Sequence, residues 1–181
     1  PCSGKSSVMA MLKEEFPEIH FVPEVASIII SQVGILPSRD PIKNRSFQRT
    51  IYRVGKIFRT TSTEFAIAQG KKAVVLDRGE ADGAAYFAGG VDEFEEVLCT
   101  KIEAEHKNVK MVLCLAVPPR EVYERNKVNN PARSESYAEA MALGERTQKA
   151  WEDHPNFHLI DNEDGWDAKV DRVRQLIRSV I

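Results

Sequence analysis

The chain opens with Pro1-Cys2-Ser3-Gly4-Lys5-Ser6-Ser7. These residues match the second half of a phosphate-binding loop of the form G-x-x-x-x-G-K-[ST]. In such a loop, backbone N–H groups surround a phosphate at the positive end of a helix, while a lysine and a hydroxyl face the phosphate oxygens and Mg²⁺. We therefore expect all seven residues to bind nucleotide, with Gly4 allowing close backbone approach, Lys5 supplying charge and Ser6 supplying the metal-side hydroxyl.

The residues after this loop fit the context that the motif requires. Val8, Leu12 and Phe16 lie on one face of an expected helix that Pro17 ends. This pattern argues against the alternative that the glycine and serines form only a turn and a helix cap. The motif also has a strand before it. We expect that strand, and the first glycine of the loop, to lie ahead of Pro1.

Composition limits the class of protein. With 181 residues, of which 43% are hydrophobic and 29% charged, the chain is expected to form a single domain over residues 1–181. A net charge of −2 argues against nucleic acid as a partner, because such binding needs an excess of Lys and Arg. No apolar run reaches transmembrane length. Three scattered cysteines favour a reduced, cytoplasmic setting.

Short apolar runs alternate with helical patterns along the chain. Strands are expected at residues 19–25, 73–77, 111–117 and 157–160, and helices at 45–69, at 80–87 and from Asp167 onward. The last helix has a stripe of Val170, Val173, Ile177 and Val180 that is expected to pack in the core. The alternation predicts an α/β fold of the P-loop NTPase type, with a three-layer parallel sheet covered by helices on both faces.

Two acidic residues follow expected strands, so both are predicted to lie at the edge of the sheet where ligands gather. Asp77 is predicted to hold Mg²⁺ together with Ser6; its alternative role is to cap the next helix. Glu24 is predicted to act as a general base or metal-shell residue, or else to pair with an arginine. Arg78 either stabilises charge on the transferred phosphoryl group or pairs with Glu24.

A second set of candidates surrounds this edge. Residues 118–151 are interpreted as a lid that brings cations over a triphosphate, with Arg133 as its leading residue; the alternative is a solvated charged face. The other cations of this segment are Arg120, Arg125, Lys127, Arg146 and Lys149. Asp82 and Tyr86, and also Gln48 and Arg49, are further candidates for an acceptor pocket.

Five motifs together resemble a known family. They are PCSGKSS at 1–7, VPEVA at 22–26, FQRTIY at 47–52, LDRGEADGAAY at 76–86 and NPARSES at 130–136. Their order is similar to that of the AAA-type P-loop ATPases that include NadR-like ribosylnicotinamide kinase domains and TRP-translocation-defect-like nucleotide-binding proteins. The resemblance implies a nucleoside- or nucleotide-kinase-like sheet, bound Mg-nucleotide, and an acceptor pocket beside Glu24 and Asp77.

Two functions are compatible with these residues. The first is a kinase that moves the γ-phosphate of ATP to a hydroxyl of a nucleoside-like small molecule, with Lys5, Glu24, Asp77, Arg78 and Arg133 in the catalytic set. The second is a switch that binds ATP or GTP, hydrolyses it slowly and presents a surface to a protein or lipid partner.

Overall fold

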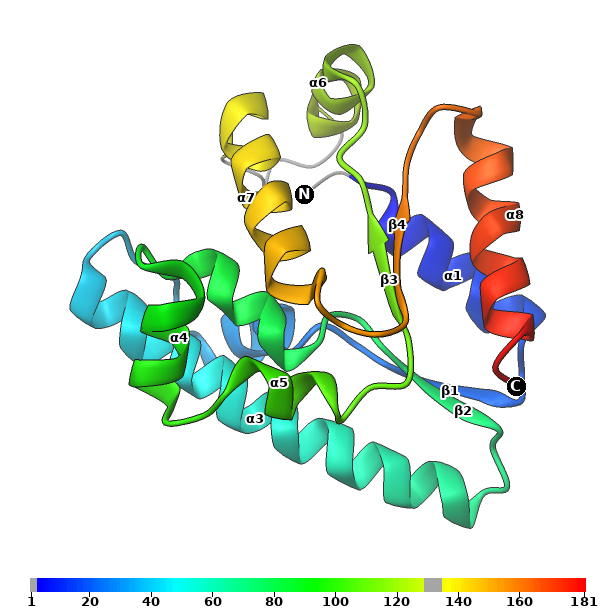
Figure 1. Ribbon diagram of the computed structural model, residues 1–181, viewed down its shortest axis with the longest axis horizontal. Helices are drawn as coiled ribbons and strands as arrows, with labels where there is room; N and C mark the ends of the chain where they lie inside the picture. The colour runs from blue at the N-terminus through cyan, green and yellow to red at the C-terminus, as the bar shows by residue number, and fades with distance from the viewer. Residues whose placement is uncertain (1–2, 129–134) are drawn as a thin grey trace.

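The computed structural model describes residues 3–128 and 135–181, and Figure 1 shows how their helices surround a few short strands. In chain order the elements are α1 (Lys5–Glu15), β1 (Ile19–Val22), α2 (Val25–Ile28), the π-helix η1 (Ile29–Val33), α3 (Pro41–Ala68), β2 (Ala73–Leu76), the 3-10 helix η2 (Glu80–Tyr86), α4 (Gly90–Leu98), α5 (Ile102–His106), β3 (Val112–Leu115), α6 (Arg120–Val128), α7 (Tyr137–Trp151), β4 (Phe157–Ile160) and α8 (Gly165–Arg178).

The strands form two parallel pairs. In one pair, Ile19 of β1 lies beside Ala73 of β2. In the other, Val112 of β3 lies beside Phe157 of β4. The expected parallel pairing of the strands is confirmed, and the described residues form two separate two-stranded sheets instead of one three-layer sheet.

A large cavity lies between the two strand pairs. It has a volume of about 1560 Å³ and is lined by residues 72–77, which include β2, and by residues 109–117, which include β3. No ladder bond of the described strands crosses it, so β2 and β3 each have one edge without a strand partner. The side chains of both strands are only half-buried, although all are apolar or cysteine.

Helices cover the strands on two sides, in agreement with the alternating sequence pattern. On one side, Val8, Leu12 and Phe16 of the α1 region pack with a stripe on α8 formed by Val170, Val173 and Ile177. On the other side, η2, α4 and α5 surround Phe94, which is fully buried, and Trp151 from α7. A third, small cluster joins α6 to α7 through Tyr123 and Ala140.

Several boundaries differ from the sequence expectations. The strand expected at 19–25 ends at Val22, and Val25 starts α2, which η1 follows. The long helix starts at Pro41 instead of Arg45, because the Asp40 side chain caps it by accepting a hydrogen bond from the backbone N–H of Lys43 at 2.9 Å. Residues 80–86 form a 3-10 helix. The final helix starts at Gly165, and Val180 lies beyond its end.

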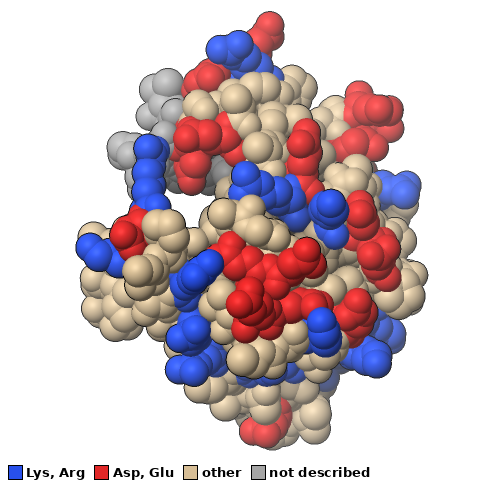
Figure 2. All heavy atoms as spheres, turned by 60° about the vertical axis from the view of Figure 1, so that its left-hand side comes forward, with Lys and Arg blue, Asp and Glu red and all other residues tan. Residues whose placement is uncertain are grey.

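The surface mixes charges of both signs. On the face drawn in Figure 2, acidic side chains gather near the centre and basic ones lie around them. The helices of the described ranges include none with both the length and the apolar character that a membrane span requires.

Candidate active site

The phosphate-loop residues stand at the start of α1. Gly4 is the N-cap of this helix and has a φ of 82°, a conformation that glycine adopts without a Cβ penalty. The indole of Trp166 lies so close to Gly4 that an added Cβ would overlap its ring. The first N–H groups of α1 have no acceptor within the helix, and this is the geometry that favours anions.

Lys5 contacts Asp77 directly. The Lys5 ammonium donates a hydrogen bond to Oδ1 of Asp77, from α1 to the residue that follows β2. The backbone N–H of Asp77 extends the β1–β2 ladder by donating to Val22 O at 2.9 Å. The lysine side chain thus points toward the strand edge, and the loop and the strand-terminal acid form one site.

Glu24 and Asp82 both bind Arg78, and they do so from different elements. Arg78 Nε donates to Glu24 Oε1 at 2.5 Å, and Arg78 Nη1 donates to Asp82 Oδ2 at 3.2 Å. The other oxygen of Glu24 accepts a hydrogen bond from Ser27 Oγ at 2.7 Å. Of the two interpretations of Arg78, pairing with Glu24 is therefore the one seen in this structure.

The charges in this cluster set the protonation of its members. Burial raises the pKa of the Glu24 carboxyl, but the charge of Arg78, the Ser27 hydrogen bond and the charge of Lys5 outweigh it, so the net pKa lies below the ordinary value. Burial also lowers the pKa of Arg78, yet Tyr86, Asp82 and Glu24 raise it overall. Glu24 is thus an ionised hydrogen-bond acceptor at neutral pH.

The candidate Mg²⁺ ligands provide suitable chemistry. Ser6 and Asp77 line the same cavity and offer a hydroxyl and a carboxylate, the hard oxygen donors that Mg²⁺ prefers. Such a site needs few protein ligands, because Mg²⁺ usually keeps several waters and binds substrate phosphates. Across the described ranges, three or more His, Cys, Asp or Glu side chains do not gather in a metal-binding cluster.

Some of the expected site residues are placed elsewhere or not described. Pro1, Cys2 and Arg133 lie outside the described residues. Gln48 is buried and lines the cavity. Arg49 donates to Val97 O at 3.4 Å on the surface side of α3.

Four cations of the proposed lid have described side chains, and these are Arg120, Arg125, Arg146 and Lys149. Arg146 of α7 donates to Ala85 O at 3.4 Å. Arg120, Arg125 and Lys149 are exposed.

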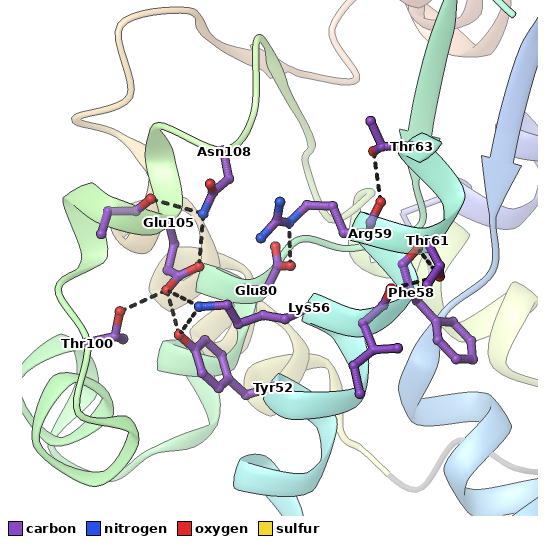
Figure 3. Close-up of polar contacts among 12 residues, drawn as sticks. Tyr52, Lys56, Phe58, Arg59, Thr61, Thr63, Glu80, Thr100, Glu105 and Asn108 are labelled. Atoms are coloured by element: carbon purple, nitrogen blue, oxygen red, sulfur yellow. Dashed lines mark hydrogen bonds and ion pairs between the residues drawn. The ribbon is translucent and has the colours of Figure 1, made fainter. Parts of the chain in front are cut away.

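Two contacts of the site were not expected from the sequence. The Trp151 indole N–H donates to Asp82 Oδ1 at 2.6 Å. At the start of η2, Arg59 Nε donates to Glu80 Oε1 at 2.7 Å, while Glu80 Oε2 is buried and has no hydrogen-bond partner among the described residues (Figure 3). Both pairs join residues far apart in the chain, and only their residue types were visible in the sequence.

A second buried carboxylate lies nearby in the same view. Glu105, 1% exposed, accepts hydrogen bonds from Tyr52 at 2.6 Å and Thr100 at 2.8 Å, and it lies 3.7 Å from Lys56 (Figure 3). These partners satisfy a charge that would otherwise be costly to bury. The cluster ties α3 to α5 beneath the site.

Comparison with known proteins gives a family. No curated protein matches the chain. A sequence family described as "AAA domain" matches residues 1–169 of the 181. This match covers the loop, both strand-terminal acids and the Arg78 cluster. The chain therefore belongs to the AAA domain family, P-loop domains that bind nucleotides.

Proposed function

We propose that this protein is a Mg-dependent, ATP-binding phosphotransferase that moves the γ-phosphate to a hydroxyl of a nucleoside-like small molecule. The observation that carries the proposal is the contact between Lys5 and Asp77, with the Glu24–Arg78 ion pair beside it. A phosphate-binding lysine thus lies next to both a metal-type acid and a second, ionised carboxylate. Phosphoryl transfer needs these parts, because it depends mainly on positioning and charge.

The loop residues have a direct role in binding. Lys5 exchanges Asp77 for phosphate oxygens when nucleotide enters, and the N-terminus of α1 faces the same phosphates. Ser6 and Asp77 would hold Mg²⁺. The ion, when bound, would neutralise charge on the phosphate oxygens. Arg78, beside Glu24, is assigned to the charge on the transferred phosphoryl group.

Glu24 is assigned to the acceptor hydroxyl. Its lowered pKa makes it a weak proton acceptor but a good charged hydrogen-bond acceptor. We therefore infer that Glu24 mainly orients the hydroxyl for attack. The resemblance to NadR-like kinase domains supports a nucleoside-like acceptor, ribosylnicotinamide among the first to test.

A transfer screen tests this proposal. The purified protein is incubated with γ-labelled ATP, Mg²⁺ and a panel of nucleosides, nucleotides and ribosylnicotinamide. One labelled product is expected, and Glu24→Gln is expected to lower its rate by about 10²-fold while ATP affinity stays unchanged. Glu14→Gln, an exposed acid on α1, is the matched control. A Glu24→Gln protein with normal turnover would contradict the role of Glu24.

A second candidate is a nucleotide-dependent switch that binds a protein or lipid. It is favoured by the separate small core of α6 and α7, in which Tyr123 and Ala140 are fully buried against Tyr137 and Val117. Such a unit can reorient as a body when ATP or GTP binds. Limited proteolysis of residues 118–151 tests this candidate. Nucleotide alone, without acceptor, is expected to slow cleavage; equal cleavage with and without nucleotide removes the support.

A further inference from the structure

A chain of hydrogen bonds connects α7 to the candidate acceptor site. Trp151 Nε1 donates to one oxygen of Asp82 at 2.6 Å, and the other oxygen of Asp82 accepts from Arg78 Nη1 at 3.2 Å. Arg78 Nε then donates to Glu24 at 2.5 Å. All four residues line the cavity that also contains Lys5 and Asp77. The last residue of α7 is thus linked to the acid assigned to the acceptor.

The Trp151 indole, the first donor in this series of hydrogen bonds, is held on several sides. Trp151 is 3% exposed, and its ring stacks on His106 at a centroid distance of 5.1 Å and an interplanar angle of 19°. Gly79 lies directly against it, because an added Cβ there would be only 2.6 Å from Trp151 Cζ2. With the ring fixed in this way, its N–H has a fixed direction toward Asp82.

Arg78, in the middle of this series of hydrogen bonds, has an unusual backbone conformation. Arg78 has a φ of 82°, a region that side chains other than glycine rarely adopt. Such a conformation persists where the surroundings over-determine it, and it is common at functional sites. The two carboxylates that bind the Arg78 guanidinium, Glu24 and Asp82, provide that restraint.

We propose that Trp151 is a positioning residue for the acceptor site: it orients Asp82, and Asp82 together with Glu24 fixes the guanidinium of Arg78. The expected effect of Trp151 on the rate of phosphate transfer rests on the proposed phosphotransferase function. Its structural content, the coupling of Trp151 to Arg78, is independent of that function. Trp151 itself acts only through Asp82 and has no assigned contact with phosphate.

Kinetics of Trp151→Phe test the consequence. Phenylalanine keeps an aromatic ring against His106 but lacks the N–H. We expect kcat for phosphate transfer to fall roughly tenfold with little change in KM for ATP. The matched control is Tyr52→Phe, which removes a hydrogen bond of the same length, 2.6 Å, from a ring that packs against the same hydrophobic cluster. The control is expected to keep kcat within about twofold, and an equal fall in both variants would overturn the proposal.

A double-mutant cycle tests whether Trp151 acts through Asp82. Asp82→Asn removes the charged acceptor, so adding Trp151→Phe to it is expected to lower kcat by less than twofold more. Losses that multiply in the double variant would overturn the proposal, because the two residues would then act separately.

A spectroscopic measurement separates this inference from the proposed function. In the ¹⁵N NMR spectrum, Trp151→Phe is expected to shift the Arg78 Nε–H resonance, whereas Tyr52→Phe leaves it in place. If the wild-type protein transferred no phosphate while this shift was present, the proposed function would be wrong and the coupling would stand. An unmoved Arg78 resonance in Trp151→Phe would overturn the coupling whatever the activity.

Discussion

Gly79 shows how a single hydrogen atom in place of a side chain permits the packing of the site. The glycine lies against the indole of Trp151, with no room for a Cβ. Because the ring is buried and stacked on His106, it has little space to withdraw. The glycine is therefore a requirement of packing here, since its φ of −101° is open to any residue.

We predict that Gly79→Ala destabilises the protein by about 1–3 kcal/mol, the usual cost of forcing extra volume into a packed region. Gly55→Ala is the control, because its expected change in the free energy of unfolding has the opposite sign. Gly55 lies inside α3. The atom nearest to a Cβ added there is Glu80 Cγ, at 4.0 Å. Alanine there is expected to stabilise by roughly 0.5–1 kcal/mol. Urea unfolding of the two variants measures both values, and a neutral Gly79→Ala would contradict the packing described.

Glu24 makes the stability of the protein depend on pH. Its ionised form is favoured in the folded state, so its pKa there is lower than the ordinary 4.5. Its contribution is therefore fully present above pH 4.5 and is lost as pH falls through the folded-state value. We predict that Glu24→Gln is less stable than wild type at pH 7, and that the difference shrinks below pH 4.5. Thermal melts from pH 3 to 8 test this; a difference that does not change with pH would contradict it.

At the scale of single elements, α7 has a well-defined start. Ser136 Oγ accepts from the backbone N–H of Glu139 at 3.3 Å, and the Glu139 carboxylate accepts from the backbone N–H of Ser136 at 2.7 Å. This reciprocal capping box satisfies two N–H groups that would otherwise lack partners. The helix also carries Trp151 at its far end, so its first turn and the site belong to one rigid element.

We predict that Ser136→Ala costs about 0.5–2 kcal/mol of stability, the range measured for such caps. Ser136→Asp, which keeps an acceptor at the cap, is expected to cost clearly less. Urea unfolding compares the three proteins. Equal stability of all three would show that the cap has no role in holding α7.

The elements also show which sequence signals are reliable. The apolar run 157–160 became β4 without change, and the spacing of Val170, Val173 and Ile177 identified the buried face of α8. The start of α3 was missed, although Asp40 before Pro41 is a recognisable cap signal. Helix α2 and η1 were missed because Val25 to Ile30 is apolar at almost every position, so its periodicity is uninformative.

At the scale of the whole molecule, a cavity lies between the two strand pairs. Parallel strands pair at about 4.8 Å, but β2 and β3 are separated by a cavity of about 1560 Å³ that both line. A phosphate-binding loop has a strand leading into it. We infer that one further apolar strand, parallel to β2 and β3, would fit between them.

We predict that a short Val- and Ile-rich segment, fused ahead of Pro1 through a glycine-containing loop, raises the melting temperature by several degrees. It would pair with both open edges and bury the half-exposed side chains of β2 and β3. A Gly/Ser extension of the same length is the control. Equal melting temperatures for the two fusions would contradict this use of the cavity.

The sequence predicted which residue types form the site, but it did not predict the hydrogen bonds that link them. Lys5, Asp77 and Glu24 are predicted from a loop motif and two strand ends, which have fixed positions in this class of fold, and the structure brings Lys5 and Asp77 into contact. The link from Trp151 to Asp82 spans 69 residues and depends on how α7 packs, which no local pattern reports. Likewise, the Arg78 backbone conformation is a property of the folded state only.

The central claim is that Lys5 and the start of α1 bind the phosphates of a nucleotide beside Asp77. Isothermal titration of Mg-ATP into wild type, Lys5→Ala and Lys13→Ala tests it most directly, because Lys13 is an exposed lysine near the other end of the same helix. We predict that Lys5→Ala weakens binding by roughly ten- to a hundredfold, as the loss of a charged hydrogen bond implies, and that Lys13→Ala binds as wild type does. Equal affinity in all three proteins would contradict the account.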